Sequence, residues 1–305
     1  MISCHLISDA YPVEPQLLRT FVAVARLGSF SAAARELGYT QAAVSQQIAA
    51  LEADLKTQLL TRRPVTPTEA GTRLLEHADP ILLRLDAARA DVTRMTKTPP
   101  ATLLIGVTPL AGATSTLAES LATLRARMPR LSVTVQTATR DQLATGVARG
   151  EFDLALTDGL TAPADPLPEQ VPVTAIGLSE ERVSVVLPVG HPLAANPTLR
   201  LPDLADARWI AADNVAPPLK EIRRHAAVDG FKPAMHYTGT DITTLLNLAA
   251  AGHGLTLLPE KLLSAAGIKA VSVTQPRVGH RVELLHPALP ADSPATALAA
   301  ILTQH

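Results

Sequence analysis

Two glycines divide the alanine-rich stretch near the N-terminus into three short segments with helical periodicity. In the first segment, from Gln16 to Leu27, apolar residues recur at helical spacing until Gly28 interrupts them. The second segment is expected to begin after an N-cap at Ser31 and to end at Gly38, which tolerates left-handed backbone. Two helices joined by a tight glycine turn predict a helix-turn-helix, in which small residues let the helices cross closely.

The third segment is expected to be the recognition helix, with Thr40 as its cap. Its apolar stripe, at helical spacing, comprises Val44, Ile48, Leu51 and Leu55. Gln41 then lies at the exposed N-terminal end, and Gln46 faces outward with Ala42 and Ser45. Such residues meet base edges in the major groove, where glutamine pairs most naturally with adenine. The alternative is an ordinary solvated helix face, because glutamine is also a good helix former.

A short extended loop follows the third segment and carries two arginines. Arg62 and Arg63 precede Pro64 and Pro67, as in the wing of a winged helix, which grips backbone phosphate or the minor groove. Together with the helix, this loop predicts a DNA-binding surface. The predicted DNA-binding residues are Ser31, Thr40, Gln41, Ala42, Ala43, Ser45, Gln46, Arg62 and Arg63.

A long helix is expected from Thr68, its cap, to about Thr96, with a kink at Pro80. Its apolar residues alternate in steps of four and three, the pattern of a heptad seam. The seam comprises Leu74, Ala78, Ile81, Leu85, Ala88, Val92 and Met95. A seam of this kind predicts a dimer, which suits the reading of two half-sites, and the alternative is packing on its own domain.

The pattern changes to alternating strands and helices after the hinge-like stretch "TKTPP". This alternation predicts a parallel sheet with crossover helices, in two successive α/β units. Ligands of such sheets bind at the carboxyl ends of strands, where hydroxyls and free N–H groups suit a carboxylate or another small anion. The predicted effector-binding residues are Thr108, Pro109, Thr137, Thr139, Asp213, Asn214 and Thr240.

Composition excludes several classes of protein. The formal net charge is −1, so charge alone does not suggest nucleic acid. Cys4 is the only cysteine, which excludes an internal disulfide and a thiolate metal cluster and favours a reducing cytoplasm. No apolar run is long enough to span a bilayer, and the first residues are not expected to form a signal peptide. No catalytic or metal-binding motif stands in a supporting context, so neither an enzyme nor a cofactor is expected.

The N-terminal domain resembles the LysR-type transcriptional regulators. The resemblance rests on "LLRTFVAVARLGSFSAAARELGYTQAAVSQQIAALEADL" and "VTPTEAG", and it continues in "HPLA" and "LLNLAAAGHGLTLLP". It implies a winged helix-turn-helix, a dimerising linker helix and a two-lobed effector domain of periplasmic-binding-protein type, an α/β fold. It also implies homodimers or homotetramers on promoter DNA, with RNA polymerase as a further partner. The chain departs from the family at Gln46, often arginine, at Leu60, often phenylalanine, and in a short wing.

The expected domain organisation follows from these patterns. It consists of a tail at 1–12, a winged helix-turn-helix at 13–67, a linker helix at 68–96, a hinge at 97–100 and an effector domain at 101–305. In the effector domain we expect lobe I at about 101–165 and 277–305, and lobe II at about 170–274. The expected function is effector-controlled transcription regulation in the cytoplasm, and the alternative is a solute-binding protein of the same fold without a gene-regulatory role.

Overall fold

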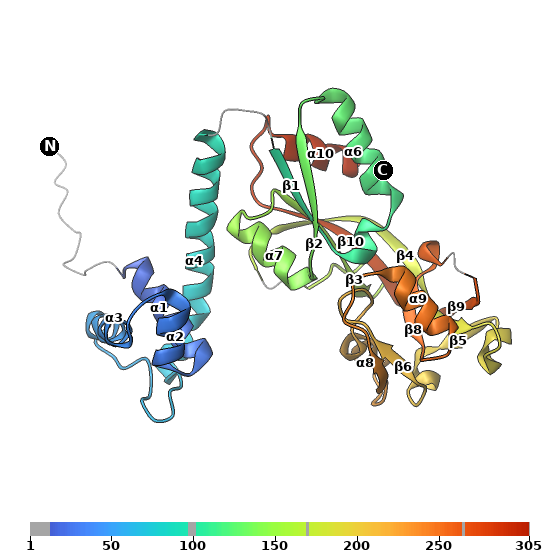
Figure 1. The fold of residues 1–305 in the computed structure, drawn as a ribbon, viewed down its shortest axis with the longest axis horizontal. Helices are drawn as coiled ribbons and strands as arrows, with labels where there is room; N and C mark the ends of the chain where they lie inside the picture. The colour runs from blue at the N-terminus through green and yellow to red at the C-terminus, as the bar shows by residue number, and fades with distance from the viewer. Residues whose placement is uncertain (1–12, 97–101, 169–170, 264–265, 305) are drawn as a thin grey trace. The chain divides into compact units, whose positions relative to one another are not determined.

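The computed structural model describes residues 13–96, 102–168, 171–263 and 266–304, and the chain divides into two compact units, residues 1–89 and 90–305 (Figure 1). Each unit has its own buried apolar clusters. The tail at 1–12, which includes Cys4, and the hinge at 97–100 lie outside the described residues. No helix in the described ranges is long and apolar enough to cross a lipid bilayer.

The first unit begins with three helices, and glycines separate them. These helices are α1 (Pro15–Leu27), α2 (Phe30–Leu37) and α3 (Gln41–Asp54). Gly28 and Gly38 follow α1 and α2 in left-handed conformation, with φ of 59° and 71°, so both predicted breaks are confirmed. The hydroxyl of Thr40 accepts the Ala43 N–H at 3.1 Å, which confirms the predicted cap of α3.

The predicted cap of α2 is wrong. Ser29, and not Ser31, has the extended backbone of an N-cap, and its hydroxyl accepts the Ala32 N–H at 3.2 Å. The helix therefore begins at Phe30, whose ring is buried in the core of this unit. Burying that ring explains the earlier start, and it leaves Ser31 exposed on the first turn.

The apolar stripe of α3 packs into this core as predicted, except at its end. Val44, Ile48 and Leu51 are fully buried. Leu55 is 37% exposed and stands at the C-cap, because the chain turns away at Lys56 with a φ of 50°. The stripe therefore holds α3 on α1 and α2 through its middle, and its polar face remains on the surface.

A short hairpin links α3 to the long helix α4 (Glu69–Thr96). Leu60 and Pro67 form an antiparallel bridge, which gives the extended loop predicted for the wing. The hydroxyl of Thr68 accepts the Gly71 N–H at 3.0 Å and so caps α4 as predicted. The helix is continuous through Pro80.

The predicted heptad seam of α4 is divided between two environments. Ala78 is fully buried and packs with Leu18 of α1, as the alternative of packing on its own domain requires. Further along, Ile81 and Val92 are 49% and 62% exposed. The side chain of Met95 lies outside the described residues.

The second unit contains an eight-stranded sheet in the order β2-β1-β3-β10-β4-β9-β5, with β8 also paired to β4. Its strands are β1 (Thr102–Val107), β2 (Ser132–Thr137), β3 (Leu154–Thr161), β4 (Thr174–Pro188), β5 (Thr198–Arg200), β8 (Thr256–Pro259), β9 (Ile268–Gln275) and β10 (Gly279–His286). Strand β1 runs parallel to β2 and β3, but β10 runs antiparallel to β3 and β4. The prediction of a parallel sheet is confirmed for β1, β2 and β3. It is wrong for β10 and β4, because β10 runs antiparallel to β3 and β4, and β4 runs antiparallel to β8 and β9, so the sheet is mixed.

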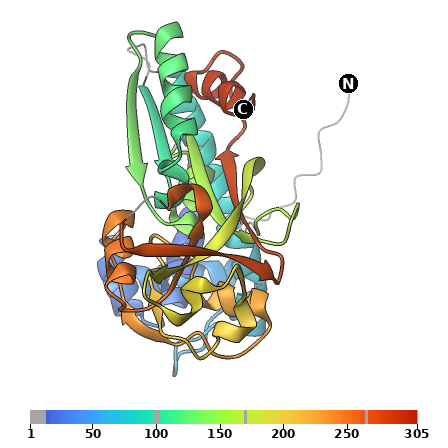
Figure 2. The same cartoon turned by 90° about the vertical axis from the view of Figure 1, so that its right-hand side faces the viewer.

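Lobe I has helices on both faces of β1, β2 and β3. These helices are α5 (Pro109–Gly112), α6 (Ser115–Arg127), α7 (Arg140–Arg149) and α10 (Pro294–Leu302). Figures 1 and 2 show α6 and α10 side by side, and both pack on the face that buries Leu103 and Leu284. Helix α7 covers the opposite face through Leu143 and Val147. The short helix α5 directly precedes α6, and Thr114 is the N-cap of α6.

Lobe II is formed by β5, β8 and β9, a second sheet and two further helices. The additional elements are β6 (Trp209–Ala211), β7 (Pro233–His236), α8 (Leu219–Ala226), α9 (Ile242–Ala250) and the 3-10 helices η1 (Pro192–Ala195), η2 (Leu201–Leu204) and η3 (Glu260–Leu262). Strand β4 belongs to both lobes, because it pairs with β10 up to Arg182 and with β8 from Val183 onward. Trp209 is fully buried and packs on Phe231, with ring centroids 5.3 Å apart.

Candidate DNA interface and effector site

The N-terminal face of α3 presents uncharged hydrogen-bonding groups to solvent. Gln41, Ala42 and Gln46 are exposed, while Ala43 and Ser45 are half-buried. The hydroxyl of Ser31 on α2 donates to Oε1 of Gln41 at 2.9 Å, so two predicted DNA-binding residues from different helices lie together.

Gln47, the residue after Gln46, has a structural role. The hydroxyl of Thr20 on α1 donates to its Oε1 at 2.5 Å. Because Thr20 is fully buried, this bond fixes the rotation of α3 about its own axis. Gln46 is consequently held on the outer face.

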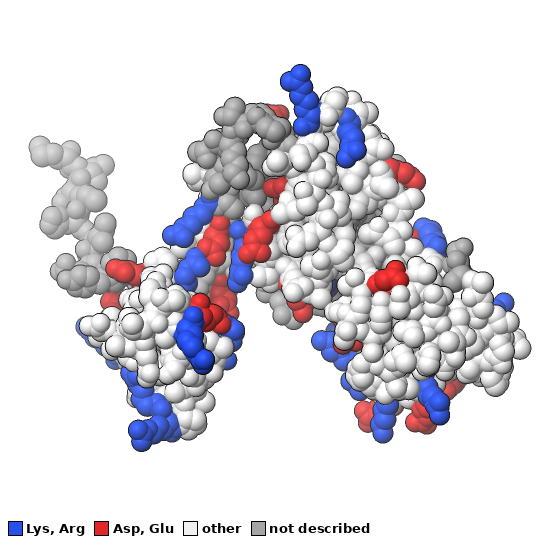
Figure 3. All heavy atoms as spheres, in the orientation of Figure 1, with Lys and Arg blue, Asp and Glu red and all other residues white. Residues whose placement is uncertain are grey.

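The two arginines of the wing have different surroundings. Arg62 lies over the ring of Phe30, and its guanidinium carbon is 4.9 Å from the ring centroid. Its Nη2 is 3.4 Å from Oε2 of Glu52. The other oxygen of Glu52 accepts the N–H of Leu59 at 2.9 Å. Arg62 therefore braces the wing against α2 and α3, and both Arg62 and Arg63 are exposed to solvent. Basic side chains gather at this end of the first unit, on the loop between α3 and α4 (Figure 3).

The predicted effector residues of lobe I lie at the carboxyl ends of neighbouring strands. Val107 of β1 pairs with Thr137 of β2, so Thr108 and Pro109 follow β1 beside the end of β2. Thr137 is exposed, but Thr139 caps α7 in a capping box with Gln142. The hydroxyl of Thr139 is therefore already used by its own helix.

The structure places Thr108 in a buried polar cluster with Asp158 of β3 and His280 of β10. The Thr108 hydroxyl donates to Oδ1 of Asp158, and Nε2 of His280 donates to Oδ2 at 2.9 Å. Thr108 is 6% and His280 1% exposed. The sequence analysis predicted neither Asp158, the partner of Thr108, nor His280, the second partner of Asp158. The available signal was an acidic residue at the end of the apolar strand "FDLALTD".

The surroundings of Asp158 decide its charge. Burial alone would raise the pKa of Asp158, but the hydrogen bond and charge of His280 and the hydrogen bonds from Thr108 and the Ala111 N–H outweigh it. The pKa of this carboxyl is therefore held below its ordinary value. Asp158 is a buried anion at the start of α5.

The predicted effector residues of lobe II follow strands β6 and β7. Asn214 donates from Nδ2 to the carbonyl of Thr238 at 2.7 Å, which ties the two loops together. Asp213 and Thr240 are exposed beside them, and Thr240 immediately precedes Asp241, the cap of α9. The structure therefore brings the effector residues together in two groups, one in each lobe.

Helix α8 of lobe II lies against lobe I and was not predicted to take part in the site. Nε2 of His225 is 3.3 Å from the carbonyl of Leu160 on β3. Burial raises the pKa of Glu221, although Arg224, Arg140 and Lys220 partly oppose this shift. Because Arg140 starts α7 in lobe I, groups from both lobes act on Glu221, and this region is the lobe junction.

Comparison with known families matches both parts of the chain. Residues 15–72 match the model described as bacterial regulatory helix-turn-helix protein, lysR family. Residues 97–305, more than half of the chain, match the model described as LysR substrate binding domain. The chain belongs to the LysR family of transcriptional regulators.

Relatives of this LysR regulator cover most of its length. It is 32% identical to the probable hydrogen peroxide-inducible genes activator of Mycobacterium avium, over 88% of this chain and 86% of that protein. It is 30% identical to the small neutral protease regulatory protein of Streptomyces coelicolor, over 80% of this chain and 73% of that protein.

Solved structures agree with the fold. Full-length BenM matches 95% of this chain and 96% of its own length, with a TM-score of 0.56 and 22% identity. Full-length CbnR in complex with its target DNA matches 95% of this chain and 99% of its own, with a TM-score of 0.53 and 21% identity. The two-lobed α/β effector domain preceded by a helix-turn-helix is thereby confirmed.

The LysR chain is a DNA-binding transcriptional regulator with an effector domain, and it is not an enzyme, as its sequence predicted. The alternative of a solute-binding protein without a gene-regulatory role is not supported, because the helix-turn-helix model matches the N-terminal unit. Regulators of this family bind promoter DNA and small-molecule effectors and form oligomers.

Proposed function

We propose that this regulator reads its operator with α3 and the wing, dimerises through α4 and responds to a small anionic effector at the lobe junction. The observation that carries this proposal is the outward face of α3, where Gln41 and Gln46 are exposed above a fully buried stripe. We extend the proposal to a contact with RNA polymerase when the regulator is bound at a promoter.

The groups on α3 and the wing have complementary roles in this proposal. Gln46 and Gln41 offer both a donor and an acceptor, which one adenine edge can satisfy. Thr40 and Ser31 lie at helix starts, where hydroxyl and backbone N–H groups suit a phosphate. Arg63 is exposed and free to approach the DNA backbone, and Arg62 supports the wing from below.

Replacing the two exposed glutamines tests the recognition helix. Gln41→Ala and Gln46→Ala are each expected to weaken specific operator binding about 5- to 100-fold, because each removes a base contact. Gel shifts with operator and with scrambled DNA measure the effect. The matched control is Gln136→Ala, an exposed glutamine on β2 of the other unit. Operator affinity unchanged in both α3 variants would remove α3 from the interface.

The exposed part of α4 supports the dimer. Ile81 and Val92 are separated by about three helical turns, so they lie on one side of the helix. Large apolar side chains at such exposure in a regular heptad favour burial against a second copy of α4. The upstream position Ala78 already packs against α1, which limits the dimer seam to the positions from Ile81 onward.

The double variant Ile81→Asp/Val92→Asp is expected to be monomeric at micromolar concentration. In a dimer, the aspartates at these two positions would face the aspartates of the second copy of α4, and the repulsion between them would destabilise the helix pair. A monomer can bind only one half-site, so operator binding would also weaken. Light scattering after size-exclusion chromatography measures the oligomeric state. Asp79→Lys, a charge change elsewhere on α4, serves as the control. A double variant that remains dimeric would show that α4 is not the dimer seam.

The effector is proposed to act where the two lobes meet. Strand β4 passes through both lobes, and α8 of lobe II touches β3 of lobe I, so a molecule bound there contacts both. Effector binding changes the equilibrium between two arrangements of the lobes only as far as the effector binds one arrangement more tightly than the other.

A further inference from the structure

The wing, the hairpin of residues 59–68, is held together by its own hydrogen bonds. The N–H of Thr61 donates to the carbonyl of Thr66 at 2.8 Å, next to the tip that carries Arg63. At the base, the N–H of Thr68 donates to the opposite arm at 2.9 Å. Because these bonds tie the two arms of the hairpin together, a shift at its base also moves Arg63 at its tip.

Glu52 of α3 holds the base of this hairpin. Its Oε1 accepts the N–H groups of Leu59 and Leu60, at 2.9 and 3.2 Å. Its Oε2 lies 3.4 Å from Nη2 of Arg62, whose guanidinium covers the buried ring of Phe30 on α2. One carboxylate of the recognition helix therefore fixes the wing through two backbone groups and one arginine.

The surroundings of Glu52 make these contacts costly to lose. Its side chain is 15% exposed, compared with 47% for Arg62. Hydrogen bonds to a charged group are stronger than those between neutral groups, and a mostly buried carboxylate that loses them does not recover full hydration. Arg62 combines ring stacking with a charge pair, so its guanidinium has a fixed geometry.

Glu52 is a negative charge in a unit that is proposed to bind a polyanion. Coulomb repulsion alone makes such a carboxylate unfavourable for DNA binding, so its removal would strengthen binding. If Glu52 instead positions the wing, its removal weakens binding, because Arg63 then no longer meets its phosphate. The two explanations predict effects of opposite sign.

We propose that Glu52 is a positioning residue for DNA binding, which places Arg63 on a phosphate through the wing backbone and Arg62. Of the two wing arginines, Arg63 makes the phosphate contact and Arg62 is the brace. This inference rests on the proposed function, because it takes the wing as part of the DNA interface.

The test is binding of the full-length chain to a mixed-sequence DNA duplex over a series of KCl concentrations, measured by fluorescence anisotropy. Phosphate contacts do not depend on base sequence, so this probe reports on them without an operator. Glu52→Gln and Arg63→Gln are each expected to weaken binding about threefold to tenfold and to lower the magnitude of the slope of log Kd against log salt by about one. In the Glu52→Gln background, Arg63→Gln is expected to weaken binding by less than about twofold, because both substitutions remove the same contact.

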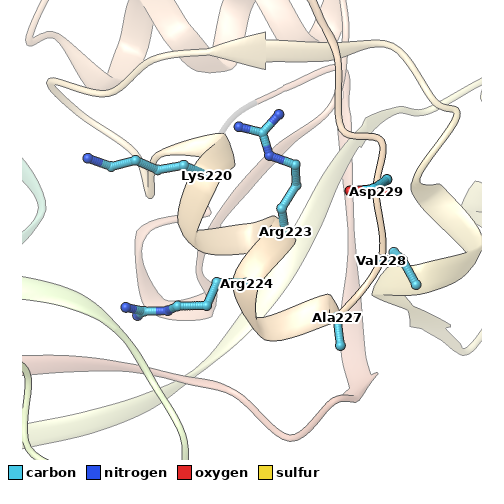
Figure 4. A pocket seen from close by; sticks show the side chains of 6 residues that line it. All are labelled: Lys220, Arg223, Arg224, Ala227, Val228 and Asp229. Carbon is cyan, nitrogen blue, oxygen red and sulfur yellow. The ribbon is translucent and has the colours of Figure 1, made fainter.

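Two control variants measure the plain effect of charge. Glu36→Gln removes a carboxylate from the same unit that is also paired with an arginine, Arg26, but lies on α2. It is expected to leave binding unchanged or to strengthen it. Arg223→Gln removes an exposed positive charge from the effector unit, where Figure 4 shows the side chain extending away from α8, and it is expected to leave the slope unchanged.

Arg62→Lys tests the brace separately and keeps the charge. A lysine still serves as a phosphate ligand, but it lacks the planar group that stacks on Phe30. Binding is expected to weaken about threefold or more although the net charge is unchanged, and circular dichroism checks that the variant is folded. This variant also carries the test if Glu52→Gln does not fold.

Three results would overturn the proposal. They are stronger binding by Glu52→Gln, an undiminished effect of Arg63→Gln in its background, and parent-like binding by Arg62→Lys, which would make Arg62 a phosphate ligand. If Arg63→Gln leaves binding and slope unchanged in the otherwise unaltered chain, the wing is not at the interface, and the proposed function fails as well. When Arg63→Gln does weaken binding, a failure is confined to the role of Glu52.

Discussion

Asp158→Ala is expected to lower the free energy of unfolding of the effector unit by about 3–5 kcal/mol, because it leaves buried partners of a charged group without their acceptor. His280 is 1% exposed, and its Nδ1 already has no hydrogen-bond partner among the described residues. Removing Asp158 would leave Nε2 without its acceptor and leave the Thr108 hydroxyl only the carbonyl of Leu156, 3.5 Å away. Denaturant unfolding followed by the fluorescence of Trp209, the only tryptophan, reports on this unit alone.

Two comparisons make this prediction specific. Thr108→Val removes one hydrogen bond from the same cluster and should cost only about 1 kcal/mol. The effect of Asp158→Ala should also depend on pH. Because the pKa of Asp158 is lowered in the folded state, its stabilisation is complete above the unfolded value, about 3.9, and is lost as pH falls through the folded value. The gap between parent and variant should therefore shrink in acid, and a constant gap would contradict a charged Asp158.

Gly71→Ala is expected to destabilise the DNA-binding unit by about 2–4 kcal/mol through overpacking. A Cβ at this position would lie 2.1 Å from the carbonyl oxygen of Leu59. That oxygen accepts the Thr68 N–H at 2.9 Å, so the clash falls where the wing joins α4. The first turn of α4 would have to move away, and the wing and α3 would lose their support.

Circular dichroism, limited proteolysis and operator gel shifts would measure the effect of Gly71→Ala. The Trp209 transition of the effector unit should not change. Gly38→Ala is the matched control, because its φ of 71° costs about 1 kcal/mol for alanine but no atom lies within 4 Å of the added carbon. Equal stability of Gly71→Ala and the parent would show that the contact with Leu59 relaxes without cost.

The N-terminal unit was largely predictable because its signals are local. Gly28, Gly38 and Thr40 act on the residues next to them, and the α3 stripe needs only helical periodicity. The error at Ser31 was also local: two serines compete for one cap, and burial of Phe30 decides between them. The division of the α4 seam was not visible, since the heptad does not show which positions α1 occupies.

The effector site was less predictable because its chemistry depends on distant pairs. Thr108 was correctly placed at a strand end, but Asp158 is 50 positions away from it in sequence. His280 is 122 positions from Asp158, and no local pattern links the two. Likewise, nothing in the local sequence of α8 indicates that Glu221 is influenced by Arg140 of α7.

The sequence by itself determined the class of protein, the helix-turn-helix and the alternation of strands and helices, because spacing, caps and glycine turns act over a few residues. Three features were decided only by the tertiary structure. Strand β10 runs antiparallel to its neighbours, Asp158 accepts hydrogen bonds at the start of α5, and α8 lies against lobe I. The physical reason is that a buried charge or a strand partner is chosen by proximity in space, which local periodicity does not encode.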